Sequence, residues 1–207
     1  MKKFLSFSAV TLIFFVLADS SFAFTKKELK SMGDFLTPFV RFSLENFDVK
    51  ADGDDDLLHL GDPANVYHLI SFGIDYNVRY NHSLVKLCED PDCKLNGFMT
   101  IDGKYVKETV KKFFDIDIEN QTVTDEDMGI TIEYDGKVYH FDGDVEGEDY
   151  STVVEKATRN GKIITMLGTF YSYNKPFRKF EATAKNHKYK GKNTFAILSL
   201  KVGEIIQ

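Results

Sequence analysis

The chain of 207 residues has no tryptophan, only two cysteines and only four prolines, and it lacks any excess of basic residues. Lysine and arginine number 26 against 32 aspartate and glutamate, so the formal net charge is −6. A nucleic-acid partner requires a basic surface, and this composition therefore argues against one. Hydrophobic residues make up 43% and charged residues 28%, a balance typical of folded chains rather than disordered ones.

Long apolar runs are also lacking, except at the N-terminus, so no later segment reaches the roughly 20 residues that span a bilayer. Two lysines precede an apolar stretch from Phe4 to Ala18, and small residues follow at Ser21 and Ala23. This order is typical of a secretory signal peptide. We therefore expect residues 1–23 to be cleaved and residues 24–207 to be periplasmic or secreted, without a stable membrane span.

The two cysteines are interpreted in the light of export. Cys88 and Cys93 enclose the turn-forming sequence Asp90-Pro91-Asp92. In an oxidising compartment this pair predicts a structural disulfide. A catalytic redox pair favours two intervening residues, and a metal site needs more ligands than two thiols, whereas no histidine follows within ten residues.

Helical periodicity begins just after the expected cleavage point. Thr25 and Glu28 have the spacing of a capping box, and an apolar stripe predicts a helix over residues 25–47. Pro38 falls on the polar side of this helix, where we expect a kink. Residues 48–61 then form an acidic connection.

Two further helices are predicted by their N-terminal signals. Asp62 and Pro63 begin the second helix, and Asp102 caps a third helix that runs to Phe114. The second helix has an apolar stripe of Val66, Leu69, Ile70, Gly73, Ile74 and Val78. Its opposite, solvent-facing side carries His68, Asp75, Arg79 and His82.

After residue 128 the pattern alternates between apolar and polar residues, which predicts strands. Asp135-Gly136 and Asn160-Gly161 are strong signals for tight hairpin turns, and residues 190–193 predict a third turn. Helices followed by an antiparallel meander indicate an α+β class. We predict three N-terminal helices packed on one curved meander sheet of five to six strands.

The order of elements resembles the nuclear-transport-factor-two-like (cystatin-like) fold, a curved sheet wrapped around helices. No linker divides residues 24–207, so we expect a single domain, with a mainly helical part at 24–128 and the meander at 129–207. The segment Lys162–Val202 also resembles the C-terminal half of exported bacterial proteins of unknown function. Neither resemblance implies catalytic residues, because this fold carries many functions.

A histidine–carboxylate pair is the first candidate for chemistry. His140 and Asp142 are two residues apart, and hence lie on one face of a regular strand. Such a pair could act as a general base and its orienting group. No nucleophile motif accompanies it, so we favour the polar end of a strand.

Two amides on the second helix are the other candidate. Asn77 and Asn81 point toward its apolar arc, flanked by Tyr76 and Tyr80. A buried amide without a partner costs about 1–3 kcal/mol, so both need partners. We favour capping or loop contacts, and a pocket wall for a small ligand is the alternative.

Two acidic segments follow the ligand order of a calcium-binding loop. The first has lysine and histidine at two ligand positions, and the second lacks the final carboxylate. We therefore interpret both as solvated loops, with calcium binding as the alternative. The candidate ligands are Asp48, Asp52, Asp54 and Asp56 in the first segment and Asp142, Asp144 and Glu146 in the second.

Phosphate-loop, zinc and dinucleotide motifs are missing, so the sequence predicts no cofactor. We expect an exported, non-catalytic binding or envelope-associated module with a protein or small-ligand partner. The alternatives are a small pocket enzyme of hydrolase or isomerase type and a calcium-stabilised adhesion module. A cavity lined by His140, Asp142 or Asn77 would favour a ligand site, whereas an interior filled by phenylalanines would oppose it. The phenylalanines expected there are Phe35, Phe39, Phe113 and Phe170.

Overall fold

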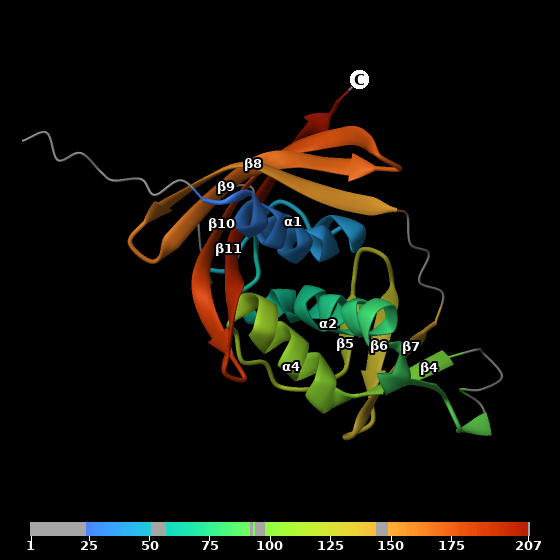
Figure 1. The fold of residues 1–207 in the computed structure, drawn as a ribbon. Helices are drawn as coiled ribbons and strands as arrows, with labels where there is room; N and C mark the ends of the chain where they lie inside the picture. The colour runs from blue at the N-terminus through green and yellow to red at the C-terminus, as the bar shows by residue number, and fades with distance from the viewer. Residues whose placement is uncertain (1–23, 51–56, 92, 94–97, 144–148, 207) are drawn as a thin grey trace, which may run out of the picture.

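The computed structural model describes residues 24–50, 57–91, 93, 98–143 and 149–206, which have an α+β fold (Figure 1). The expected signal peptide lies outside these residues. Their α-helices are α1 (Lys26–Arg41), α2 (Val66–Tyr80) and α4 (Gly103–Phe114), with two 3-10 turns at Pro63–Asn65 and His82–Leu84. The helices occupy the space between a six-stranded and a five-stranded sheet. Within the ranges described, no helix has the length and apolar character of a bilayer span.

The six-stranded sheet has the order β2-β1-β11-β10-β9-β8 and is antiparallel except between β1 and β2. Its short strands are β1 (Phe47–Asp48) and β2 (Leu58–His59). Its long strands are β8 (Tyr150–Asn160), β9 (Ile163–Ser172), β10 (Lys175–Tyr189) and β11 (Lys192–Ile205). Register shifts interrupt the ladders of all four long strands, and such bulges curve a sheet.

Tight turns join the long strands. Gly161 and Gly191 adopt left-handed conformations with φ of 59° and 77°, as the predicted hairpins require. A further turn at Tyr173 and Asn174, with φ of 49° and 62°, is not signalled by glycine in the sequence. β10 begins directly after this turn, at Lys175.

The beginning of α1 confirms the predicted capping box. The Thr25 hydroxyl accepts the Glu28 N–H at 3.2 Å, and the Glu28 carboxylate accepts the Thr25 N–H at 2.8 Å. The helix lies across β8 (Figure 1), with Gly33 directly against the Thr152 backbone. A side chain at Gly33 would clash there, so glycine permits this close approach. Thr37 adds a hydroxyl contact to Thr152 at 3.0 Å.

The end of α1 corrects two expectations. The helix stops at Arg41, because Ser43 and Asn46 take left-handed conformations, with φ of 54° and 55°, that turn the chain into β1. Pro38 is buried rather than solvent-facing, and the helix continues through it to Arg41. Proline costs the helix one N–H donor at that point, but its ring packs into the core.

Phenylalanine rings fill the space between the helices and the six-stranded sheet. Phe39 is fully buried, with its ring centroid 5.0 Å from that of Phe72. Phe113 and Phe170 are also buried, as expected, and the half-buried Phe35 stacks on Phe113 at 5.5 Å. This side of the molecule is therefore a packed core.

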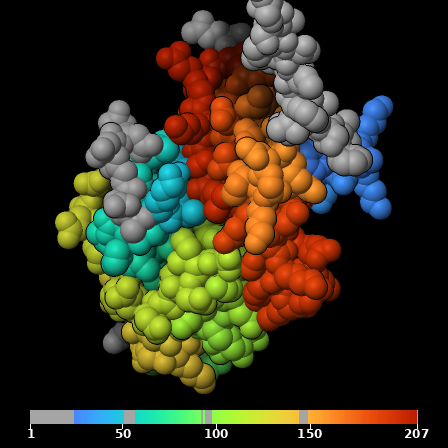
Figure 2. Space-filling view, turned by 90° about the vertical axis from the view of Figure 1, so that its left-hand side faces the viewer, coloured from blue at the N-terminus to red at the C-terminus, as the bar shows by residue number. Residues whose placement is uncertain are grey.

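α4 lies at the surface beside the β10–β11 turn (Figure 2, yellow-green and red). Asp102 caps it as predicted, because its carboxylate accepts the Lys104 N–H at 2.9 Å. An ion pair of 2.7 Å between Lys190 and Glu108 links the turn to the helix.

The five-stranded sheet has the order β3-β4-β7-β6-β5. Its strands are β3 (Val85–Leu87), β4 (Phe98–Asp102), β5 (Val123–Asp125), β6 (Ile130–Tyr134) and β7 (Val138–Asp142). The Asp135-Gly136 hairpin is confirmed, with a φ of 96° at Gly136. The Asp135 carboxylate accepts the N–H groups of Lys137 and Val138, each at 2.8 Å, and stabilises this turn.

The expectation of one meander sheet is only partly met, because the β6–β7 hairpin belongs to this second sheet. β7 pairs on its other side with β4, and the long meander begins only at β8. A second sheet forms because the middle turns of α2 carry apolar residues on more than one side of the helix. Each of these sides has to be covered by another element. Its buried residues are Leu69, Ile70, Phe72, Gly73, Ile74 and Asn77.

Candidate binding hollow and disulfide centre

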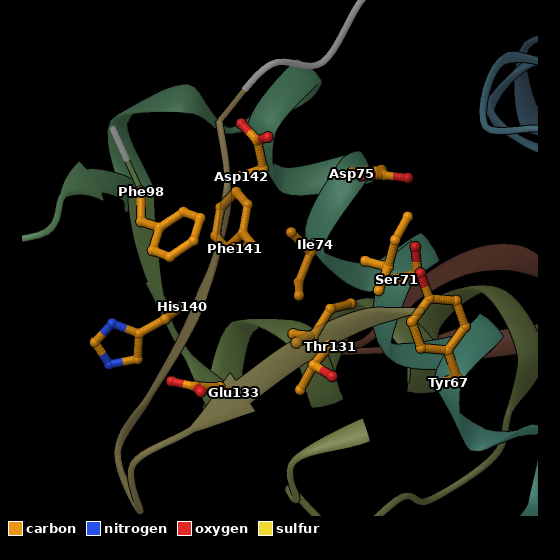
Figure 3. Close-up of a pocket in the computed structure, with 12 residues that line it drawn as sticks. Tyr67, Ser71, Ile74, Asp75, Phe98, Thr131, Glu133, His140, Phe141 and Asp142 are labelled. Atoms are coloured by element: carbon orange, nitrogen blue, oxygen red, sulfur yellow. The ribbon is translucent and has the colours of Figure 1, made fainter. Parts of the chain in front are cut away.

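A hollow of about 370 Å³ lies between α2 and the β6–β7 hairpin (Figure 3). Its apolar walls are Ile74, Phe98, Ile130, Ile132 and Phe141. Its polar lining comprises Tyr67, Ser71, Asp75, Thr131, Glu133, His140 and Asp142. This size and mixture of residues is typical of a small-molecule site.

The hollow forms because β6 and β7 separate soon after their turn. The ladder between them has only two positions, Glu133 opposite His140 and Tyr134 opposite Tyr139. In the earlier part of β6, the strand pairs with β5 and not with β7. Ile132, for example, lies opposite Val123. The strands therefore leave an opening over α2.

A polar stripe on α2 faces this opening. Tyr67, Ser71 and Asp75 are four residues apart, so they lie on one side of the helix. The sequence pattern placed Asp75 on a solvent-facing side. The structure corrects that expectation, because the five-stranded sheet covers this side and Asp75 is half-buried.

Asp75 is the most perturbed carboxylate of the hollow. Burial raises its pKa to about 6, and no cation of the described chain offsets this. The pKa of Tyr67 is also raised, first by burial and then by the charges of Asp125 and Asp75. Asp75 therefore remains partly protonated near neutral pH, and a bound cation would favour its ionised form.

The charge of the lining has one sign. Asp75, Glu133 and Asp142 contribute carboxylates, and the described residues around the hollow include no lysine or arginine. Only His140 could supply a positive charge, and it lies at one end. The lining is therefore complementary to a cation.

His140 lies at the edge of the hollow with its ring turned away from α2 (Figure 3). On β7, the buried Tyr139 and Phe141 face the helix, so His140 faces the other side of the sheet. Its Nε2 lies 3.2 Å from the Asp135 carboxylate. Asp135 is therefore the carboxylate that contacts this ring nitrogen.

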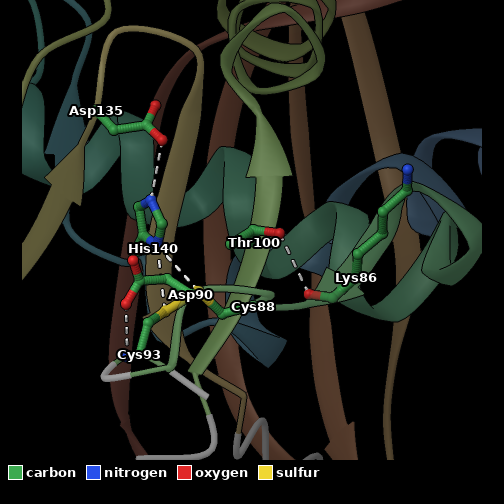
Figure 4. The surroundings of a disulfide bond; sticks show 7 residues. All are labelled: Lys86, Cys88, Asp90, Cys93, Thr100, Asp135 and His140. Atoms are coloured by element: carbon green, nitrogen blue, oxygen red, sulfur yellow. Dashed lines mark hydrogen bonds and ion pairs between the residues drawn. A yellow bond between two sulfur atoms is a disulfide. The ribbon is translucent and has the colours of Figure 1, made fainter.

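The predicted disulfide between Cys88 and Cys93 is present (Figure 4). His140 lies against it, with Nδ1 3.3 Å from the Cys93 sulfur and 3.6 Å from the Cys88 sulfur. The sequence gives no indication of this contact, because His140 and Cys93 are 47 positions apart in the chain.

Asn77 is buried away from the hollow and links α2 to α4. Its Nδ2 donates to the Gly73 carbonyl at 2.7 Å and to the Thr109 hydroxyl at 2.9 Å. Asn81 donates to its Oδ1 at 2.9 Å. Both amides therefore have structural partners, but these lie within α2 and on α4 rather than, as expected, at the helix cap or in the following loop.

Tyr76 and Tyr80 line a different hollow, of about 280 Å³, beside Phe35. The Tyr76 hydroxyl accepts from Lys112 at 2.9 Å, and the Tyr80 hydroxyl accepts from Arg41 at 3.2 Å. The four predicted pocket residues on α2 are therefore not brought to one site.

The candidate calcium ligands are only partly described. Asp48 lies in β1, where its carboxylate accepts the Lys50 N–H at 2.8 Å, and Asp142 ends β7. The others, Asp52, Asp54, Asp56, Asp144 and Glu146, lie outside the described residues.

No protein-family model, curated protein or solved structure matches this chain. The α+β class is clear from the structure, and the resemblance to the nuclear-transport-factor-two-like fold stays a prediction from element order. Function therefore has to be argued from the geometry of the hollow and of the disulfide centre.

Proposed function

We propose that this protein is an exported binding module whose hollow between α2 and β6–β7 holds a small organic cation. The signal-peptide pattern and the Cys88–Cys93 disulfide support export, to the periplasm or beyond. The observation that carries the proposal is Asp75, a half-buried carboxylate at the wall of a hollow that has no cationic partner among the described residues.

Burying a carboxylate costs free energy unless a positive charge accompanies it. Asp75 bears that cost in the ligand-free protein, as its raised pKa indicates. Glu133 and Asp142 add negative charge at the edge of the same hollow, on the face of the sheet that also carries His140. An ammonium group beside Asp75 would offset this cost, so binding energy is available to a cation and not to an anion.

The other walls favour an apolar or aromatic body on that cation. Ile74, Ile132 and Phe141 offer apolar surface, and Tyr67 offers a ring that can attract a positive charge. A ligand with an ammonium group at one end and a ring at the other would meet both kinds of wall. Simple inorganic cations would leave the apolar walls unused.

Three probes with the same ring test this assignment by calorimetry: cationic tyramine, neutral 4-ethylphenol and anionic 4-hydroxyphenylacetate. We expect tyramine to bind at least about tenfold more tightly than the others, an advantage of about 1.4 kcal/mol. Its affinity should rise with pH through about 6, as Asp75 ionises. Equal affinity for all three probes would contradict the proposal.

Asp75→Asn is the decisive variant, since it keeps the shape of the side chain and removes its charge. It should abolish the preference for tyramine and leave 4-ethylphenol binding unchanged. Glu181→Gln, on an exposed position of β10, removes the same charge away from the hollow and should alter neither. An unchanged preference in Asp75→Asn would exclude Asp75 as the recognition group.

A pocket enzyme of hydrolase or isomerase type is a second candidate function. It is favoured by the pKa of Asp75, about 6, which suits a general acid or base near neutral pH. Hydrolysis of p-nitrophenyl acetate gives a simple test for the hydrolase type. Equal rates for the wild-type protein and Asp75→Asn would count against it.

A further inference from the structure

The Cys88–Cys93 disulfide lies in a cluster with two further side chains on the face of the five-stranded sheet away from α2 (Figure 4). The strand register assembles the cluster. The Cys88 N–H donates to the Phe98 carbonyl at 3.0 Å, which continues the β3–β4 pairing, and on β4 Thr100 lies opposite His140. Cys88 and His140 therefore reach the same face from strands on either side of β4.

Asp135 orients the imidazole ring. Its Oδ2 lies 3.2 Å from His140 Nε2, and its Oδ1 is held by two backbone N–H groups of the turn. A carboxylate in this position favours the proton on Nε2, which leaves the lone pair of Nδ1 facing the sulfur atoms. The same arrangement orients histidines that bind zinc.

We propose that reduction of the Cys88–Cys93 disulfide creates a zinc site formed by both thiolates and Nδ1 of His140. The three ligand atoms already lie within 4.8 Å of one another. Four residues separate the two cysteines, a spacing found in zinc sites. Water completes the tetrahedron at the fourth position, as in zinc centres with three protein ligands.

The nitrogen–sulfur distances match a tetrahedral zinc ion. Zinc–sulfur bonds of about 2.3 Å and zinc–nitrogen bonds of about 2.0 Å at a tetrahedral angle place nitrogen and sulfur about 3.5 Å apart. The observed separations of Nδ1 from the two sulfurs are 3.3 and 3.6 Å. Only the two sulfurs must separate, from bonding distance to about 3.7 Å.

The chemistry balances with a dithiol reductant. The dithiol gives two electrons and two protons to the disulfide, yielding the thiols of Cys88 and Cys93, and itself becomes a disulfide. Zinc then displaces the two thiol protons as it binds the thiolates. Oxidation and zinc therefore compete for the same sulfur atoms, so the centre holds either a disulfide or the metal.

The experiment uses untagged protein reduced with dithiothreitol, which is then removed without air, and titrated with cobalt as a coloured substitute for zinc. We expect one cobalt per chain, with the strong thiolate charge-transfer absorption and visible bands of a tetrahedral site. Added zinc should bleach these bands, and the oxidised protein should show none. Circular dichroism before each titration establishes that the reduced chain is folded.

Matched variants separate a built site from loose thiol binding. His140→Gln should remove the tetrahedral bands, and Asp135→Asn should weaken cobalt binding by about 10- to 100-fold. His82→Gln, which changes an exposed histidine elsewhere, should bind like the wild-type protein. The double variant Cys88→Ser/Cys93→Ser should show no thiolate absorption.

If the reduced protein stays folded, two results would overturn the zinc site. One is a folded, reduced wild-type protein without tetrahedral cobalt bands. The other is a His140→Gln variant with the same bands and affinity as the wild-type protein. If reduction unfolds the chain, cobalt added to that reduced chain must restore the native circular dichroism spectrum, and failure to do so also overturns the proposal.

Discussion

The two sheets of this protein differ in how far their strands stay paired. In the six-stranded sheet, β9 pairs with β10 along its whole length apart from one register shift, and α1 packs tightly against neighbouring β8. In the five-stranded sheet, β6 and β7 share only two paired positions before they separate. The comparison shows that the hollow beside α2 opens where the pairing of β6 with β7 stops.

α2 contacts the packed helical core on one side and the five-stranded sheet on the other. On the side of α4, the side-chain amide of its buried Asn77 makes three close hydrogen bonds within the chain. On the side of the five-stranded sheet, its Asp75 has no cationic partner in the described part of the chain. One helix thus combines a buried amide that has partners within the chain with a half-buried carboxylate that is available to a ligand.

Replacing Phe39 by alanine should give the largest effect on stability. Phe39 is fully buried among aromatic rings, so the cavity left behind should cost about 3–5 kcal/mol of unfolding free energy. Phe98→Ala, at the wall of the hollow, removes a half-buried ring and should cost less than about 2 kcal/mol. Urea unfolding measures both, and equal losses would show that the two regions are packed alike.

Asn77→Ala should have the next largest effect, about 2 kcal/mol, because it leaves the Thr109 hydroxyl buried without its amide partner. A double-mutant cycle with Thr109→Val should give a coupling energy of about 1 kcal/mol. Urea unfolding of the four proteins provides the measurement. Additive losses would mean that this hydrogen bond does not stabilise the α2–α4 contact.

Asp75→Asn should stabilise the protein at neutral pH, by about 1–2 kcal/mol for a partly buried group. Burial raises the folded-state pKa to about 6 from an ordinary 3.8, so folding favours the protonated carboxyl. The wild-type stability contribution is complete below pH 3.8 and is lost as pH rises through about 6. Thermal unfolding across this range should show that decline in the wild-type protein and a smaller one in the variant.

Local signals in the sequence predicted the elements of the fold well. Thr25 and Asp102 begin helices as expected, and the turns at Gly136 and Gly161 form the expected hairpins. Each of these signals depends on a few neighbouring residues, which is why they can be read from sequence. The end of α1 was predicted too late in the chain. Leu44 and Phe47 continue the helical spacing of apolar residues, but they are buried after the chain has left the helix.

The candidate sites could not be predicted, because they depend on strand pairing between distant segments. β7 could have continued the meander, and only its pairing with β4 brings His140 to the disulfide. The polar stripe of Tyr67, Ser71 and Asp75 was visible in the sequence at helical spacing. Its meaning depended on the second sheet, which turns a solvent-facing side into the wall of a hollow.

Calcium should have the smallest effect, and it tests whether either sheet needs a metal at its acidic end. One acidic segment begins at Asp48 beside the six-stranded sheet, and the other begins at Asp142 in the five-stranded sheet. The Asp48 carboxylate already accepts the Lys50 N–H and lies 3.8 Å from the Lys50 ammonium, which competes with a metal. We therefore expect the same melting temperature in millimolar calcium and in EDTA.

A rise of several degrees would instead support the adhesion alternative, because a bound ion stabilises the folded state by mass action. Asp48→Asn and Asp142→Asn would then show which sheet holds the ion, since only the variant at the ligating segment should lose the rise. Magnesium provides the control for general charge screening, because it demands a smaller, more regular set of oxygen ligands than calcium. An equal response to both ions would indicate screening of the acidic chain rather than a site at either sheet.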